Sequence, residues 1–179
     1  MRTITPILIA TLLLTGCHST FEMVEYMFEW DETTYEPFYE EASFDKLPPK
    51  AITYLSDCYS QENITYIHTG KLYYYNETAY YIYFADTSDM IFDKKGNCIG
   101  MDKWRPQGLT KCMISKVPNV DAMQQIIAEE MARISSNPWD IRCIEIHHNG
   151  YLFKVGIEDD IFHFAFDKKG KLQYIAVEI

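Results

Sequence analysis

The sequence contains none of the short motifs that mark common catalytic or cofactor sites. Its 179 residues hold no glycine-rich phosphate loop, no G-x-S-x-G nucleophile turn and no H-E-x-x-H metalloprotease motif. No C-x-x-C pair is present either, which removes the usual sign of a zinc knuckle or of a thioredoxin-type redox site. We therefore expect that the protein is not an enzyme and that it holds no cofactor and no metal.

Basic patches are also missing, and the apolar stretch at the N-terminus is short. The formal net charge is −10, which does not favour binding to nucleic acid. The export signal described next also argues against it, so no nucleic-acid partner is expected. Residues Ile4 to Thr15 are apolar but too few to span a bilayer as a mature helix. Together with the positive Arg2 before them, they are typical of a signal peptide.

Residues Leu14-Thr15-Gly16-Cys17 match the bacterial lipobox, so we expect residues 1–17 to form a lipoprotein signal. Cleavage before Cys17 would leave lipid on its thiol and an acyl chain, such as palmitate, on its freed amine. Each buried methylene contributes about 0.8 kcal/mol, so several acyl chains hold a protein stably to membrane lipid. His18, in place of an aspartate, favours the cell outer membrane. The alternative is an ordinary secretory signal in which Cys17 is incidental.

Residues 18–45 form an acidic segment that is also aromatic. Nine acidic residues and no Lys or Arg lie between Phe21 and Asp45, whereas residues 46–179 hold 15 basic and 17 acidic residues. Disordered tethers are usually poor in aromatic residues, which this segment is not. It is predicted to be a solvated spacer between lipid and body, a segment that partly folds back on the domain, or a recognition strip.

The remaining chain repeats itself. Phe-Asp-Lys-Lys-Gly occurs at 92–96 and again at 166–170, each time after strand-like residues and before another strand. Proline opens a helix upstream of each copy, at Pro48 and at Pro118. Apolar spacing predicts a long second helix over 120–134. The fold class is therefore α+β: repeat 1 (46–108) and repeat 2 (109–179), each with one helical segment on a four-stranded antiparallel sheet whose other face is open.

The pattern of a Leu-Pro helix, an Ile-x-x-Ile strand, an alternating strand and Phe-Asp-x-x-Gly resembles a known family. The Ile pairs are Ile64, Ile67 and Ile141, Ile144. These residues look like the PepSY-like, β-lactamase-inhibitor-like domains of Bacteroides-type lipoproteins, over 47–179. The resemblance implies two sheets side by side with helices on one face. In the inhibitor proteins from which this family takes its name, the open face of the sheet binds an enzyme.

Four cysteines besides Cys17 lie in the mature chain: Cys58, Cys98, Cys112 and Cys143. An oxidising compartment permits disulfides, and four cysteines allow three pairings. One or two bridges and buried free thiols are both compatible with the sequence.

Several histidines and acidic residues are of the types that bind metals or act as acids and bases. His147 and His148 are adjacent on an expected strand and would point to opposite faces, so they do not form a metal pair. His68 and His163 are expected at the surface. Asp93 and Asp167 begin turns, where aspartate bonds its own backbone. Residues 158–160 are an acidic loop without calcium-ligand spacing.

Tyrosine is unusually frequent in this sequence, with 14 in the chain. Tyr offers a large rigid contact area with a hydrogen-bonding tip. Alternation along the strand at 80–84 predicts that Tyr81 and Tyr83 lie on the open face, joined by Ile91. These three residues are the candidate partner-binding site. The expected function is a cell-envelope lipoprotein that binds an unidentified protein, as an inhibitor of a secreted or periplasmic enzyme. The alternative is a structural or assembly component of an outer-membrane complex.

Overall fold

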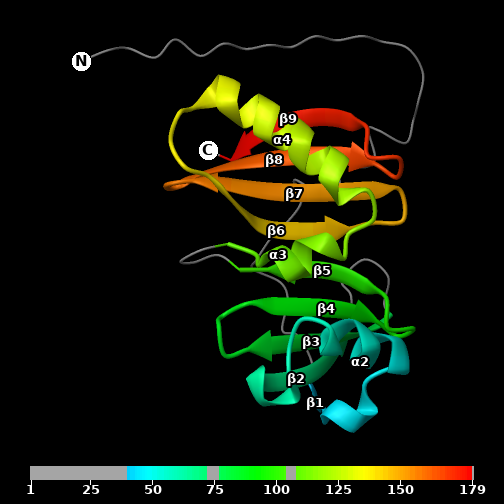
Figure 1. The fold of residues 1–179 in the computed structure, drawn as a ribbon. Coiled ribbons are helices and arrows are strands. Elements are labelled where there is room, and N and C mark those ends of the chain that lie inside the picture. The colour runs from blue at the N-terminus through cyan, green and yellow to red at the C-terminus, as the bar shows by residue number, and fades with distance from the viewer. Residues whose placement is uncertain (1–39, 72–76, 104–107, 179) are drawn as a thin grey trace. The chain divides into compact units, whose positions relative to one another are not determined.

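The computed structural model describes residues 40–71, 77–103 and 108–178. They form an α+β fold around a single antiparallel sheet of nine strands whose order follows the chain, β1 to β9 (Figure 1). The α+β class and the antiparallel sheet with one open face were predicted. The expected division into two four-stranded sheets is not confirmed, because β5 pairs with β6, with Met101 opposite Ile144, and this pairing joins the two halves into one sheet.

The strands are mostly apolar, and many of their residues are aromatic or β-branched. The N-terminal half contains β1 (Glu40–Glu41), β2 (Ile64–Lys71), β3 (Thr78–Phe84), β4 (Asp89–Asp93) and β5 (Cys98–Asp102). The C-terminal half contains β6 (Asp140–Ile146), β7 (Gly150–Ile157), β8 (Asp160–Asp167) and β9 (Leu172–Glu178). β1 belongs to the expected tether, so the last residues of that segment are part of the folded sheet.

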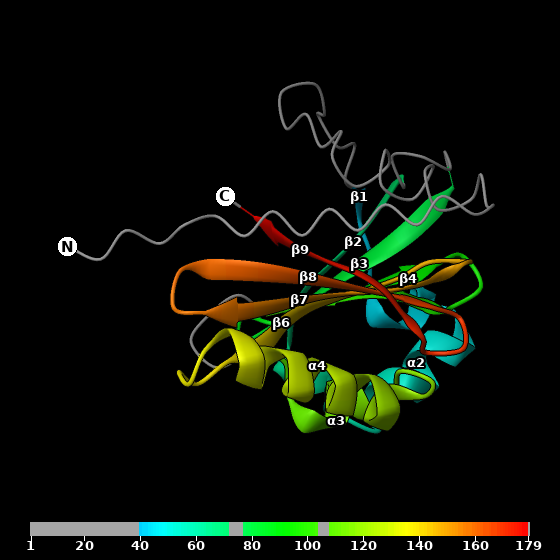
Figure 2. The ribbon, with the colours of Figure 1, turned by 90° about the horizontal axis from the view of Figure 1, so that it is seen from above.

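The described helices lie on one side of the sheet (Figure 2). They are α2 (Pro49–Ser56), which begins with proline at its first turn, α3 (Lys111–Ser115) and α4 (Val120–Ile134). Two short 3-10 turns, η1 (Phe44–Lys46) and η2 (Gln61–Asn63), flank α2. The apolar stripe of α4, which includes Met123, Ile127 and Met131, is fully buried against the sheet. None of the described helices is long and apolar enough to cross a membrane.

One hydrophobic core lies between the helices and the sheet. Phe92 and Phe166 are both completely buried there. The Phe92 ring meets Tyr54 of α2 edge to face at 5.4 Å, and the Phe166 ring meets Phe153 in the same way at 5.5 Å. Each phenylalanine therefore packs beneath the helices, on the side opposite the open face.

The two Phe-Asp-Lys-Lys-Gly turns have the same local geometry. Asp93 accepts backbone N–H bonds from Lys95 and Asn97, both at 2.8 Å, and Asp167 accepts the equivalent bonds from Lys169 and Lys171. Gly96 and Gly170 each have φ of +79°, a conformation that favours glycine. Both aspartates therefore cap their turns, as predicted.

A disulfide joins Cys58, just after α2, to Cys112 in α3. Their Cα atoms lie 5.7 Å apart, and 54 residues separate them in the chain. Cys98 and Cys143 are buried free thiols. The bridge ties the helical layer of the N-terminal half to that of the C-terminal half.

Candidate partner-binding face

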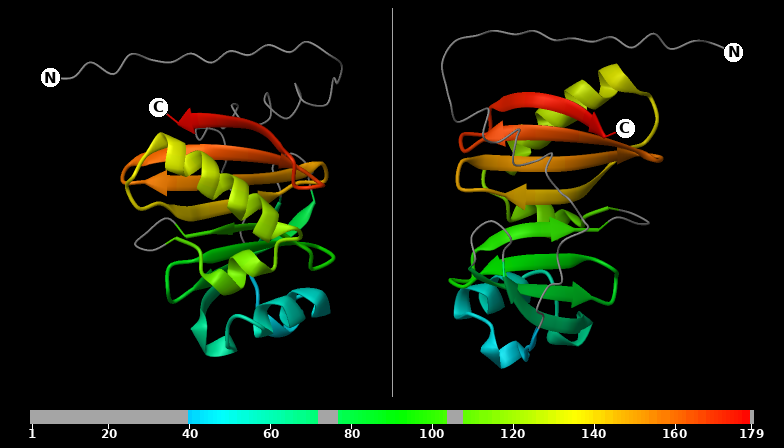
Figure 3. Two further views of the ribbon diagram at one scale, coloured as in Figure 1. Left: turned by 45° about the horizontal axis from the view of Figure 1, so that its top comes forward. Right: turned by 180° about the vertical axis from the view of Figure 1, so that it is seen from behind.

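The face of the sheet on which none of the described helices lies is called the open face here (Figure 3, right). Two rows of directly opposed residues cross it from strand to strand. One row runs Tyr66, Tyr83, Asp89, Asp102, Cys143, Lys154, His163 and Ala176. The other runs Glu41, His68, Tyr81, Ile91, Gly100, Glu145, Leu152, Ala165 and Tyr174.

Tyr66, His68, Tyr81 and Tyr83 form an aromatic cluster at the N-terminal end of this face. The His68 ring is the centre: its centroid lies 5.2 Å from Tyr66, 5.3 Å from Tyr81 and 5.2 Å from Tyr83. Tyr66 is 44% exposed, and Tyr81 and Tyr83 are partly buried. The structure thus places Tyr81 and Tyr83 on the face to which alternation assigned them.

His68 is only 6% exposed, so its expected place at the protein surface was wrong. Burial of the imidazole lowers the pKa of His68. Sequence reasoning missed His68 and Tyr66 as members of the cluster. The pairing of His68 with Tyr81 and of Tyr66 with Tyr83 would have indicated both residues. That pairing depends on the register between β2 and β3, which the sequence does not specify.

Ile91 extends the aromatic cluster onto β4, where it lies opposite Tyr81. On β5 its neighbour is Gly100, and the position of a side chain on that glycine would fall 3.5 Å from the Ile91 methyl group. The apolar surface therefore runs over β2, β3 and β4. It ends at Gly100 on β5, because glycine has no side chain. The predicted site residues Tyr81, Tyr83 and Ile91 are brought together here.

The C-terminal half of the open face is different. Lys154 occupies the place that corresponds to Tyr81, and it forms an ion pair with Glu145 at 3.0 Å. Gly156 corresponds to Tyr83. The Arg142 guanidinium lies directly over Gly156, held by Asp140 at 2.9 Å and by the Glu158 carbonyl at 2.8 Å. At these two positions, therefore, bonded polar side chains replace the tyrosines of the N-terminal half.

Two carboxyl groups, Asp89 and Asp102, lie opposite each other between these halves. Burial and then the charge of Asp102 raise the pKa of Asp89 from 3.8 to about 7. Farther along, burial acts to raise the pKa of Glu145, but the hydrogen bond from His147 and the Lys154 charge lower it to about 2. Near neutral pH, therefore, the charge of the Asp89–Asp102 pair changes while that of Glu145 stays fixed.

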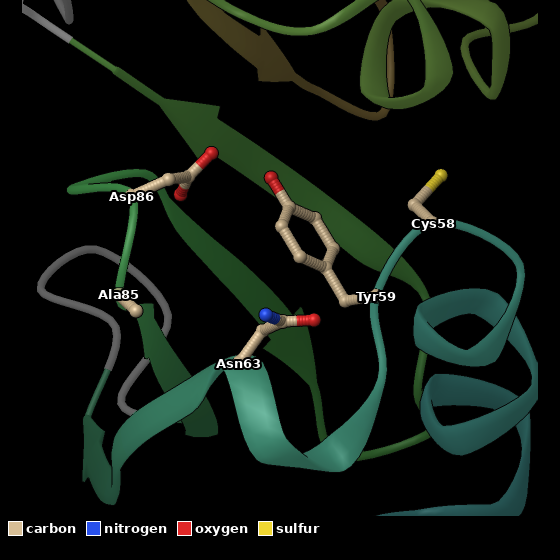
Figure 4. Close-up of a pocket in the computed structure, with 5 residues that line it drawn as sticks. All are labelled: Cys58, Tyr59, Asn63, Ala85 and Asp86. Atoms are coloured by element: carbon tan, nitrogen blue, oxygen red, sulfur yellow. The ribbon is translucent and has the colours of Figure 1, made fainter.

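A shallow depression of about 410 Å³ lies elsewhere, lined by Cys58, Tyr59, Asn63, Ala85 and Asp86 (Figure 4). Its polar groups bond within the protein. The Tyr59 hydroxyl shares a hydrogen bond with Ser88 at 2.9 Å, and Asp86 forms an ion pair with Lys103 at 2.9 Å. These bonds leave few groups to recognise a ligand.

The other candidates have local roles. His147 and His148 follow β6 and do not lie in it, and His147 bonds to Glu145. His163 bonds to Glu178 at 3.1 Å. Glu158 and Asp159 form the turn between β7 and β8, and Asp160 begins β8. In the part of the chain that the structure describes, no group of three or more His, Cys, Asp or Glu residues could hold a metal ion. Cys17 lies outside the described residues.

Solved structures from Bacteroides have a similar fold, although no family model and no curated protein matches the sequence. One, provisionally described as a calcium-regulated periplasmic protein of Bacteroides thetaiotaomicron, has 19% identity and a TM-score of 0.61 and covers 77% of this chain and 96% of its own. Two others come from Bacteroides vulgatus. A protein of unknown function, provisionally described as periplasmic, has 20% identity and a TM-score of 0.60 (77% and 98% covered). A protein of the DUF2874 family, provisionally described in the same way, has 17% identity and a TM-score of 0.58 (78% and 97%). This likeness shows the fold.

Proposed function

We propose that the protein is a cell-envelope lipoprotein whose open face binds another protein through the aromatic cluster and Ile91. The observation that carries this proposal is the contiguous aromatic and apolar surface over β2, β3 and β4. Tyrosine is enriched at protein interfaces, where a few aromatic side chains supply most of the binding energy. At the positions of the C-terminal half that correspond to Tyr81, Tyr83 and Ile91 stand Lys154, Gly156 and Ala165, so the aromatic surface is not required by the sheet itself.

A protein fits this surface better than a small molecule does. Small ligands are usually held in clefts that bury most of their surface, whereas the cluster and Ile91 lie along the pleated surface of three neighbouring strands. A standard protein interface covers about 800 Å² on each partner, so a bound protein would extend beyond the cluster onto the polar residues around it. The bonded ion pairs of the C-terminal half lie on one side of the cluster.

The envelope setting rests on the lipobox ending at Cys17 and agrees with the periplasmic descriptions of the structural neighbours. We place the protein at the outer membrane, held by lipid on Cys17. The inhibitory role follows from the PepSY-like resemblance, and so does the interpretation of residues 46–108 and 109–179 as two repeats. The matching turns of Asp93 and Asp167 support the repeats.

The test compares capture of envelope proteins by the full chain and by two variants. Tyr81→Ala with Tyr83→Ala removes half of the aromatic cluster, and Tyr174→Ala removes one tyrosine from the other end of the same face. We expect the double variant to lose a specific partner by about 30-fold in affinity, or about 2 kcal/mol, as for hot-spot residues. Tyr174→Ala should retain it. Equal capture by all three would overturn the proposal.

Inhibition is tested once the partner is captured. If the partner is an enzyme, equimolar wild-type chain should suppress its activity, and the Tyr81→Ala, Tyr83→Ala variant should not. Deleting residues 18–39, and leaving β1 in place, separates the assembly alternative. A binding module that acts through the open face keeps its partner after this deletion, whereas an assembly factor that acts through the acidic segment loses it.

A further inference from the structure

Strand β9 forms the edge of the sheet at its C-terminal end. In the part of the chain that the structure describes, its one neighbour is β8, so its outer backbone groups face away from the sheet. Edge strands of natural proteins are usually short, or they carry lysine or proline that prevents further pairing. Residues Leu172–Glu178 contain neither lysine nor proline and extend over seven residues. This edge can therefore accept another strand.

Apolar side chains are also left exposed at this edge on the helix side. Val177 is 49% exposed and Ile134, the last residue of α4, is 44% exposed. Ile175 is only partly buried, although it packs against the core. Figure 1 shows α4 crossing the sheet obliquely, with its C-terminal end extending past β9. The C-terminal end of α4 therefore projects beyond β9, the last described strand at this edge of the sheet.

We propose that two copies of this chain associate through β9, which pairs antiparallel with β9 of the second copy about a two-fold axis at Ile175. The resulting sheet continues through both molecules, with all α helices on one side. This association uses the edge of the sheet and is independent of the proposed partner on the open face.

The sequence of β9 is complementary to itself in this register. Ile175 faces Ile175 of the second copy on the helix side, and Tyr174 faces the small Ala176 of the second copy on the open side. A large side chain beside a small one packs without a clash. Antiparallel pairing also brings the Lys171 end of one strand toward the Glu178 end of the other, so unlike charges approach. The overhanging end of α4 then lies over the second copy's β9.

The opposite edge explains why the assembly stops at two copies. The residues of β1 that the structure describes, Glu40 and Glu41, present two negative side chains, which disfavours pairing with the like edge of another copy. A two-fold contact through β9 uses this edge of both copies and is therefore closed. The near balance of 15 basic and 17 acidic residues in 46–179 leaves little repulsion between the folded bodies.

Cross-linking in cells that produce the full chain tests the pairing directly. Opposed residues of an antiparallel pair have Cα atoms about 4.5–5.5 Å apart, within reach of a disulfide. Ile175→Cys should therefore give a species of twice the chain mass on a non-reducing gel, lost on reduction. Thr65→Cys, exposed on β2, is the matched control and should remain single. No double-mass species, or equal amounts from both variants, would overturn the pairing.

A second measurement tests the pairing without an added cysteine. Val177→Lys places a charge on an exposed position of the edge, where it leaves the core intact. We expect the full chain in density-matched detergent to sediment as a dimer and the Val177→Lys chain as a monomer, with Thr65→Lys still a dimer. A monomeric wild-type chain would overturn the proposal, as would a disulfide adduct of Ile175→Cys with a different protein. Retained capture of the open-face partner by Val177→Lys keeps the two proposals apart.

Discussion

Removing the disulfide between Cys58 and Cys112 should lower the free energy of unfolding by about 4 kcal/mol. The magnitude follows from the chain separation of 54 residues, because a crosslink removes conformational entropy from the unfolded chain in proportion to the logarithm of the loop it closes. Other contacts hold the same junction: Lys116 pairs with Asp57, and the Tyr59 hydroxyl contacts the Met113 sulfur at 3.0 Å. The folded structure should therefore persist without the bridge.

The assay is urea unfolding of the chain carrying Cys17→Ser, with and without Cys58→Ser and Cys112→Ser. The paired serine substitution should lower the midpoint without a loss of native secondary structure. Reductant should shift the parent chain to the same midpoint and leave the serine variant unchanged. That control distinguishes the loss of stability caused by breaking the disulfide from any effect of the reductant on the free thiols Cys98 and Cys143. A loss below about 1 kcal/mol, or an equal reductant effect on both chains, would refute the reasoning from loop closure.

Three further predictions concern the core, the acid pair and the anchor. Phe92→Ala and Phe166→Ala should each cost about 3–5 kcal/mol of unfolding free energy, because both rings are fully buried; small losses at both would contradict their place in the core. Asp89 has a folded pKa of about 7 against its usual 3.8, so the folded state holds its proton longer and this group makes the protein less stable as pH rises from about 4 to 7. Asp89→Asn should therefore raise stability at pH 8 relative to wild type and flatten that pH dependence, and an unchanged pH profile would argue against the opposed Asp102. Cys17→Ser should abolish acylation and leave soluble or unprocessed protein, and normal partitioning of that variant into the detergent phase would remove the lipid anchor.

The sequence predicted those elements whose signal is local. The helix at 120–134 follows from apolar spacing and was confirmed, because α4 spans the same residues. The turns at Asp93 and Asp167 were predicted from the aspartate and glycine in each. Alternation along β3 was enough to separate the face of Ile82 from that of Tyr81 and Tyr83.

Features that depend on pairing between distant strands were not predictable. The joining of β5 to β6 turned two expected sheets into one, and nothing local to either strand specifies its neighbour. Register shifts beside Thr65 and Arg142 displace the simple alternation, which places Arg142 over Gly156. The burial of His68 and the opposition of Asp89 to Asp102 depend on the same long-range register. Four cysteines likewise left the pairing open until Cys58 and Cys112 were brought together.

The central claim is that the aromatic end of the open face contacts a protein partner in the envelope. The most direct measurement replaces Tyr81 or Tyr83 with a photo-cross-linking amino acid in living cells that produce the full chain. The same replacement at Glu62, exposed in η2, serves as the control. Light should give one discrete adduct, of the same mass, from positions 81 and 83 and none from position 62. Absence of an adduct at both tyrosine positions, or equal adducts at all three, would contradict the claim.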